Sequence, residues 1–211
     1  MAVAHRHKRR WIGIDISGIA VDEIQEELTR FGLQNGHGYD LIEGQPDTMA
    51  EYNRLNPYDK QDWLIRRLKG LPNPRKSGDS GIDGDMDIHI GVDRQDRDQW
   101  GRVIFSVKTG KQRKPADVRE LRGTLERERA QIGILILDVE PSEGMEAEAS
   151  KAKQFTYQQR KDMPPKEYDR IQILTAYEII EGAQIDCPPT MQIVKQYRAA
   201  QAQYKQTEMT M

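Results

Sequence analysis

The sequence predicts an α/β fold in which helices cover a mixed β-sheet, and three observations lead to this prediction. Apolar and polar residues alternate along residues 86–92 and again along 103–108, which is the pattern of half-buried strands. The run Ile132–Leu137 is apolar on both faces, as in a strand buried in the middle of a sheet. Helical patterns precede, separate and follow these strands, and that order is typical of a layered α/β domain.

The N-terminal part predicts one strand and one helix. Residues 11–16 (Trp-Ile-Gly-Ile-Asp-Ile) predict a buried strand that ends in an acid. Ser17 suits the N-cap of a helix that runs to about Phe31, because apolar residues recur on one helical face. Residues 32–57 are rich in Gly, Asn, Asp and Pro, which favours a connector.

The middle of the chain predicts a helix and a hairpin. The helix covers Asp59–Leu68 and is followed by a loop at 70–81 that contains prolines and glycines. Two strands, Ile82–Val92 and Val103–Lys108, stand on either side of a polar turn at 93–101. We therefore expect these two strands to pair.

The C-terminal half continues the alternation of helix and strand. Pro115 suits the first turn of a helix that runs to Ala130, ahead of the buried strand 132–137. A helix near 142–155, a strand at 170–174, a short helix at 176–182 and a polar, Gln-rich tail complete the predicted elements.

Composition narrows the class of protein. The 211 residues include 36% hydrophobic and 31% charged residues with a net charge of −2, so any surface that binds nucleic acid must be local. The single Cys187 excludes an intrachain disulfide, and with only four histidines a zinc cluster is not expected. Without an apolar signal segment or a membrane-spanning run, the expected location is the cytoplasm.

A candidate site for phosphodiester chemistry lies in the predicted hairpin. Asp83 stands between Gly81 and Gly84 at a strand start, where a phosphate backbone could approach closely. Ser106 and Lys108 are two residues apart on the next strand, so they share a sheet face. Hydrolysis needs a cation that lowers the pKa of an attacking water, and a positive group that stabilises the developing charge. Asp83 as metal ligand and Lys108 as the positive group fit these roles.

The segment after this pair is basic. Between residues 108 and 122 there are six basic and two acidic side chains, including Lys111 and Arg113. Arg119 and Arg122 are three residues apart and share a helical face, which suits contacts to phosphates. An ordinary solvated helix with mixed charges is an equally good interpretation.

Other side chains have weaker claims to a role. Asp79, Asp85 and Asp87 could form a calcium loop with Asp83, but the downstream Glu of an EF-hand is missing. His89 is expected on the polar face of its strand as a bystander. Asp62 could add a carboxylate to the metal, although a solvent-facing position is the stronger expectation, and Cys187 has no neighbour that suggests a nucleophile.

Taken in order, these motifs resemble the Mrr-like branch of the PD-(D/E)xK nuclease superfamily, as found at the C-terminus of site-specific DNA methyltransferases. The resemblance covers roughly residues 59–189 and rests on motifs that follow one another in the family's order: 81–84, 106–108, 118–123, 126–128, 132–134 and 170–174. It implies a restriction-endonuclease-like fold with Asp83 as metal ligand, Lys108 as catalytic lysine and Ser106 in the place of the second acid, where Mrr-like members often carry Gln.

The N-terminal residues 10–17 resemble a strand of such a methyltransferase, in which Asp15 would bind the ribose of S-adenosylmethionine. The Gly-rich loop and the Asn/Asp-Pro-Pro-aromatic motif of those enzymes are absent from this sequence. The resemblance therefore predicts a methyltransferase remnant with its connector at 1–50, a nuclease domain at 51–189 and a polar tail at 190–211.

Three functions follow from these interpretations. The leading one is a Mg²⁺- or Mn²⁺-dependent DNA endonuclease-like domain linked to restriction–modification, with double-stranded DNA as partner and phosphates held by Lys111, Arg113, Arg119 and Arg122. The second is a non-catalytic DNA-binding module, which Ser106 favours because a neutral oxygen binds Mg²⁺ weakly. The third is a fragment that docks on a DNA methyltransferase. No membrane partner is expected, and a homodimer is left open.

Overall fold

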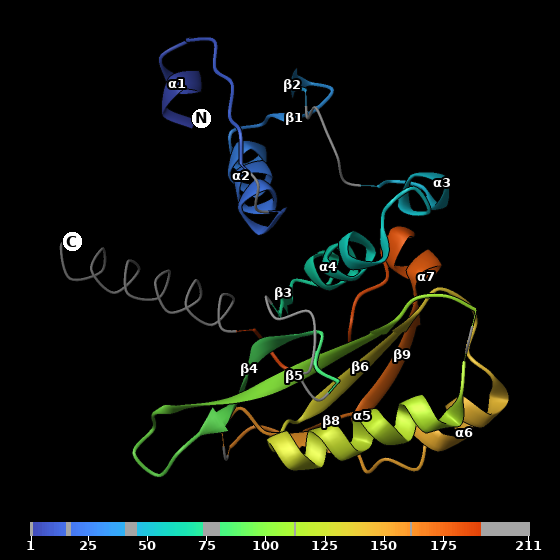
Figure 1. The fold of residues 1–211 in the computed structure, drawn as a ribbon. Coiled ribbons are helices and arrows are strands. Elements are labelled where there is room, and N and C mark those ends of the chain that lie inside the picture. Colours follow the sequence, from blue (N-terminus) through green and yellow to red (C-terminus); the bar gives the residue numbers. More distant parts are fainter. Residues whose placement is uncertain are drawn as a thin grey trace. The chain divides into compact units, whose positions relative to one another are not determined.

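The structure is a computed structural model that describes residues 2–15, 18–40, 46–73, 81–111, 113–160 and 162–190. The chain forms two compact units, Met1–Tyr52 and Asn53–Met211 (Figure 1). Three sequence predictions, the N-cap Ser17, the acid Asp79 and the polar tail beyond residue 190, lie outside the described residues.

The first unit is mainly helical. Its elements are α1 (Ala2–Arg6), α2 (Gly18–Arg30), β1 (Gln34–Asn35), β2 (Gly38–Tyr39) and α3 (Met49–Tyr52). The predicted helix up to Phe31 is confirmed by α2, but the predicted buried strand is wrong for the described residues 11–15. Ile12 and Ile14 there are 91% and 94% exposed. The described strands of this unit, β1 and β2, pair with each other. Residues 11–15 therefore have no strand to pair with among the described residues of this unit, although their sequence alternates apolar and other residues.

The second unit contains the α/β core. Its elements are α4 (Pro57–Arg67), β3 (Leu71–Pro72), β4 (Gly84–Val92), β5 (Asp98–Lys108), α5 (Pro115–Glu128), β6 (Ile132–Leu137), α6 (Glu143–Ala149), β7 (Phe155–Tyr157), β8 (Lys166–Tyr168), β9 (Ile171–Thr175) and α7 (Ala176–Ile180). Asn56 caps α4 by accepting the backbone N–H groups of Tyr58 and Asp59, which explains why this helix begins two residues before the prediction.

A mixed five-stranded sheet forms the centre of this unit. The strand order is β3-β4-β5-β6-β9, with antiparallel pairing from β3 to β5 and parallel pairing from β5 to β9. Every residue of β6 is buried, which confirms the predicted central strand. The α/β prediction and the predicted pairing of β4 with β5 are both confirmed.

Helices cover both faces of the sheet. Ile104 packs in a core cluster with Val118 and Leu121 of α5, and α6 packs beside α5. The neighbouring Phe105 points the other way, toward Ile65 and Gly70 at the end of α4. Figure 1 shows α4 and α7 on one side of the sheet and α5 and α6 on the opposite side.

Three differences from the predicted elements have local causes. The turn after β4 is shorter than predicted because the carboxylate of Asp93 accepts the N–H groups of Gln95 and Arg97, and β5 therefore begins at Asp98. The predicted helix 142–155 ends at Ala149, and Phe155 instead begins a hairpin of β7 with β8. The short strand β3 lies in the predicted loop. Among the described residues, no helix is long and apolar enough to span a membrane.

Candidate functional site

Asp83 lies directly before β4, and hydrogen bonds of both its backbone and its carboxylate hold it in place. Its backbone N–H donates to the carbonyl of Phe105 at 2.9 Å. Its carboxylate Oδ2 accepts the backbone N–H of Val107 at 2.6 Å, and Oδ1 accepts the side-chain amide of Gln61 in α4 at 2.9 Å. Both carboxylate oxygens are therefore engaged inside the fold.

The bond to Val107 replaces a missing ladder bond of the sheet. The N–H and C=O groups of alternate residues point to the same side of a strand. Phe105 pairs with Gly84 of β4, so the N–H of Val107, two residues later, points to that same side. Because β4 begins only at Gly84, the carboxylate of Asp83 takes the place of a strand carbonyl.

The other two residues of the predicted triplet lie on β5. Ser106 is 4% exposed, next to Leu135 of β6. The Lys108 amine lies 3.7 Å from a carboxylate oxygen of Glu120 in α5. Gln61 of α4 thus contacts Asp83, and Glu120 of α5 contacts Lys108.

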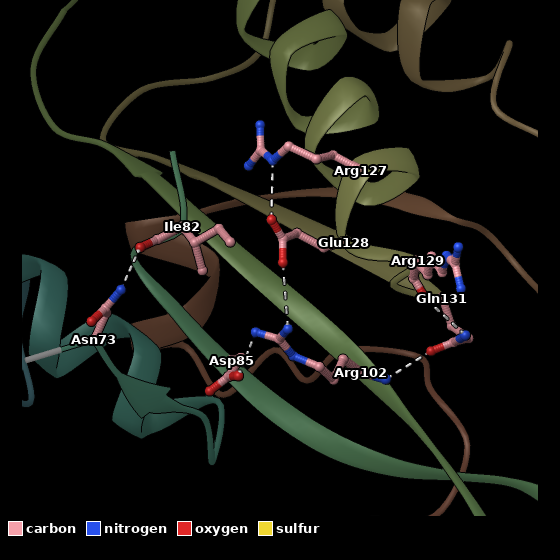
Figure 2. Close-up of polar contacts among 8 residues, drawn as sticks. All are labelled: Asn73, Ile82, Asp85, Arg102, Arg127, Glu128, Arg129 and Gln131. Carbon is pink, nitrogen blue, oxygen red and sulfur yellow. Dashed lines mark hydrogen bonds and ion pairs between the residues drawn. The ribbon is translucent and has the colours of Figure 1, made fainter. Parts of the chain in front are cut away.

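The acids that follow Asp83 do not gather around it. Asp85 binds the guanidinium of Arg102 at 2.7 Å, and the same guanidinium lies 3.8 Å from Glu128 of α5. Figure 2 shows this chain of charges crossing from β4 through β5 to α5, where Arg127 contacts Glu128 at 3.0 Å. Asp87, the second acid of β4, is exposed.

The donor set of the site does not fit a tightly held Mg²⁺. This ion prefers octahedral oxygen ligands that include at least one or two carboxylates. Within the described ranges, which leave out Asp79, no three His, Cys, Asp or Glu residues are grouped so that they could hold a metal ion. Gln61 and Ser106 are neutral, and Asp83 already accepts two N–H groups.

A comparison with protein families decides the class of this fold. Residues 61–181, more than half of the chain, match the family described as NACHT-associated inactive Restriction Endonuclease 1. The chain belongs to this family. Searches of curated proteins and of solved structures found no match.

Membership confirms the predicted restriction-endonuclease-like domain and its fold. The match begins at Gln61, the α4 residue that binds Asp83, and ends after α7, so it includes the whole five-stranded sheet. The finer assignment to the Mrr-like branch and the link to a methyltransferase stay predictions, as do the catalytic roles of Asp83, Ser106 and Lys108.

Four basic residues predicted to contact DNA lie in two different settings. Lys111 and Arg113 are exposed in the segment between β5 and α5, where Arg113 also donates to the backbone carbonyl of Glu140. Arg119 and Arg122 point from α5 toward α6, where each lies within 3.8 Å of the Glu148 carboxylate. The second pair thus bridges two helices of this family's fold.

Glu148 is the centre of this bridge, and sequence reasoning missed it. It is 8% exposed and also accepts a hydrogen bond from Lys151 at 3.0 Å. The Lys151 ammonium, together with Arg122 and Arg119, holds the pKa of the Glu148 carboxyl below its ordinary value. The surrounding charges therefore keep this acid ionised between α5 and α6.

His89 is buried, and its predicted position on the polar face is wrong. It is 3% exposed, with Nδ1 2.9 Å from the Tyr157 hydroxyl and Nε2 3.1 Å from the Asp98 carboxylate. The reason is tertiary, because the unpredicted strand β7 covers this end of β4. Burial also raises the pKa of Tyr157, with smaller contributions from Tyr168 and Asp98.

Cys187 is expected to react slowly with thiol reagents. Burial, assisted by the charge of Asp186, raises the pKa of its thiol from 9.0 to about 11. Because only the thiolate attacks, the folded protein should react with iodoacetamide about a hundredfold more slowly than an exposed thiol at the same pH. Mass spectrometry of timed samples, with the urea-unfolded chain as control, measures this. Equal rates in both states would contradict the expected protection.

Proposed function

We propose that this chain is a non-catalytic DNA-binding module built on a restriction-endonuclease-like core. One observation carries the proposal: the carboxylate of Asp83 accepts hydrogen bonds from Val107 and Gln61, so it serves the fold instead of a metal ion. The buried Ser106, which stands in the place of a second acid, supports the same conclusion.

The description of the family supports this loss of catalysis, since it contains the word inactive. It also says that these domains are NACHT-associated, and we extend the proposal to a chain that acts together with a NACHT protein. In this proposal the chain works in the cytoplasm and supplies contacts to DNA without cutting it.

We assign the DNA contacts to the segment between β5 and α5. Lys111 and Arg113 are exposed there, beside Lys114 at the start of α5. Arginine and lysine side chains bind phosphate oxygens and release counterions, which makes such binding weaker at high salt. Arg119 and Arg122 contribute less, because Glu148 lies between them and neutralises part of their charge.

A combined binding and cleavage experiment tests the proposed function. The full chain should retard a DNA duplex in a mobility-shift assay and should leave plasmid uncut in Mg²⁺ or Mn²⁺. Lys108→Ala should behave like the wild type in both assays. Lys111→Gln combined with Arg113→Gln should weaken binding and lower the salt slope by about two, one for each phosphate contact. Plasmid cleavage that disappears in Lys108→Ala would instead select the metal-dependent endonuclease.

A second candidate, docking on a DNA methyltransferase, is favoured by the exposure of Ile12 and Ile14. An extended apolar segment without a strand partner can add to the sheet edge of another protein. Hydrogen exchange measures this: the amides of residues 11–15 should become protected only when a methyltransferase is added. Exchange that stays fast in the mixture removes this candidate and leaves the DNA-binding proposal unaffected.

A further inference from the structure

The N-terminal unit carries a second concentration of positive charge. Residues 5–10 read His-Arg-His-Lys-Arg-Arg and contain four of the five Lys and Arg residues found in residues 1–52. The same 52 residues contain nine Asp and Glu, all of them outside residues 5–10. The positive charge is therefore gathered at one place in a unit that is acidic elsewhere.

The backbone of this segment brings its side chains together. Helix α1 ends in a tight reversal at Lys8, whose φ of +53° lies in the left-handed region. The N–H of Lys8 donates to the carbonyl of His5 at 2.8 Å, and the N–H of Arg9 donates to that of Ala4 at 2.9 Å. This pair of bonds is the Schellman motif, which turns the chain back across the end of a helix. Residues before and after the turn thus surround one space.

That space is a cavity of about 620 Å³, lined by His5, Arg6, Lys8, Arg9, Arg10 and Phe31. Its volume lies in the range of small-ligand pockets. Phe31 is the single lining residue that is not basic, and the guanidinium carbon of Arg6 lies 5.5 Å from the centroid of its ring. This cation–π contact holds Arg6 at the cavity wall. Arg6, Lys8, Arg9 and Arg10 are all exposed.

We propose that this N-terminal pocket binds the phosphate backbone of a nucleic acid. Guanidinium groups present paired N–H donors that match two phosphate oxygens, and three of the lining residues are arginines. The pocket lies wholly within residues 1–52, whereas Lys111 and Arg113 belong to the other unit. It is therefore a separate site, and its existence does not depend on the function proposed for the restriction-endonuclease-like unit.

The shape of the segment favours nucleic acid over an anionic membrane. A helix that lies in a membrane surface needs a long apolar face, but α1 has five residues. The ring of Phe31, the aromatic residue of the pocket, is 39% exposed and lies beside the Arg6 guanidinium. The exposed arginines at the rim suit phosphates, which bind through charge and paired hydrogen bonds.

Fluorescence anisotropy with a labelled DNA duplex tests this site in the full chain. The variant Lys8→Gln, Arg9→Gln, Arg10→Gln should bind about tenfold more weakly or worse near physiological salt, because phosphate contacts dominate affinity. Between about 50 and 200 mM salt, its log–log slope should fall by about three, one for each contact removed. Circular dichroism and thermal melting should match the wild type, because the three side chains are exposed.

A matched variant separates this pocket from general loss of charge. Arg54→Gln, Arg94→Gln, Lys153→Gln removes the same charge from three exposed positions in the other unit and should bind DNA as the wild type does. The Lys111→Gln, Arg113→Gln variant tests the other surface, so failure of one site is distinguishable from failure of the other.

Three results would overturn the inference. Unchanged binding by the N-terminal variant would show that the pocket does not contact DNA. An equal loss in the matched variant would show that only total charge matters. Binding of the wild type, but not of the N-terminal variant, to vesicles of phosphatidylserine and phosphatidylcholine, without a difference on DNA, would assign the pocket to membranes.

Discussion

Replacing Asp83 by alanine is expected to lower the free energy of unfolding by about 2 kcal/mol, the cost of leaving a partly buried N–H group without its acceptor. The group concerned is the backbone N–H of Val107, which donates to the Asp83 carboxylate. Val107 has no partner residue in β4, because the pairing of β4 with β5 ends at Gly84 and Phe105. Gln61 in α4 loses its partner as well. Urea unfolding followed by circular dichroism measures the change.

Two further variants are the controls of this experiment. Asp83→Asn keeps an oxygen for Val107, and the Gln61 amide can turn to match it, so the loss should stay below about 1 kcal/mol. Asp87→Ala removes an exposed carboxylate from the adjoining strand β4 and should change stability by less than about 0.5 kcal/mol.

The same series separates a structural acid from a metal ligand. A ligand that binds only the folded state raises its stability in proportion to the logarithm of ligand concentration. If Asp83 held Mg²⁺ tightly, millimolar Mg²⁺ would stabilise the wild type and leave Asp83→Asn unchanged. We expect Mg²⁺ to have the same small effect on both. A selective stabilisation of the wild type would contradict the structural role.

Much of the α/β unit could be predicted because its signals are local. Strand β6 is apolar at all six positions and buried at all six, so its place in the centre of the sheet follows from composition alone. Pro115 fixes the start of α5, and the apolar stripe of that helix includes Val118 and Leu121, both buried against the sheet. Long elements with a clear hydrophobic pattern can therefore be predicted from the local sequence.

Short strands could not be predicted in the same way. The hairpin of β7 with β8 has three residues in each strand, and Lys166–Tyr168 contains two polar residues out of three. Two- and three-residue strands exist because a neighbour pairs with them, and that neighbour lies elsewhere in the chain. The burial of His89 was missed for this reason, since β7 provides the Tyr157 that covers it.

The candidate site was also predicted only in part. The sequence identified Asp83, Ser106 and Lys108 as neighbours on adjoining strands, and the pairing of β4 with β5 brings their segments together. It did not reveal that Gln61 would be the side chain from α4 that reaches Asp83, because a polar residue on a helix has no preferred partner until the helix packs. The neighbouring Asp62, a weaker candidate for a metal ligand that was expected to face solvent, is half-buried.

Of the sequence patterns, the distribution of charged residues said least about the function of individual side chains. Arg119 and Arg122 suit a phosphate surface by spacing, yet both lie beside Glu148, a largely buried acid from another helix. The sequence of the basic residues 5–10 predicted no binding site, but in the fold most of these residues line a cavity. In both segments the arrangement of the backbone, rather than the number of charges, decides what a basic residue can contact.

Replacement of Gly84 is the second substitution that is expected to have a large effect on stability. The structure gives this glycine a role different from the one that the sequence suggested. A glycine beside Asp83 was expected to let a phosphate backbone come close. In the fold the backbone that comes close belongs to β3: a Cβ atom on Gly84 would lie 2.7 Å from the carbonyl oxygen of Leu71 and 2.9 Å from a methyl group of Ile65. Alanine at this position should therefore cost about 2 kcal/mol of stability, as overpacking of a tight site does.

Gly123 is the matched control for this substitution. It lies on the exposed side of α5, where a Cβ atom would meet nothing within 4 Å. Gly123→Ala should stabilise the protein by about 0.5–1 kcal/mol, because alanine loses less backbone entropy in a helix. Thermal unfolding of the two variants should thus shift in opposite directions. If Gly84→Ala were as stable as the wild type and bound DNA more weakly, the space beside Asp83 would belong to the ligand, and close packing of Gly84 against β3 would not be the reason for the glycine.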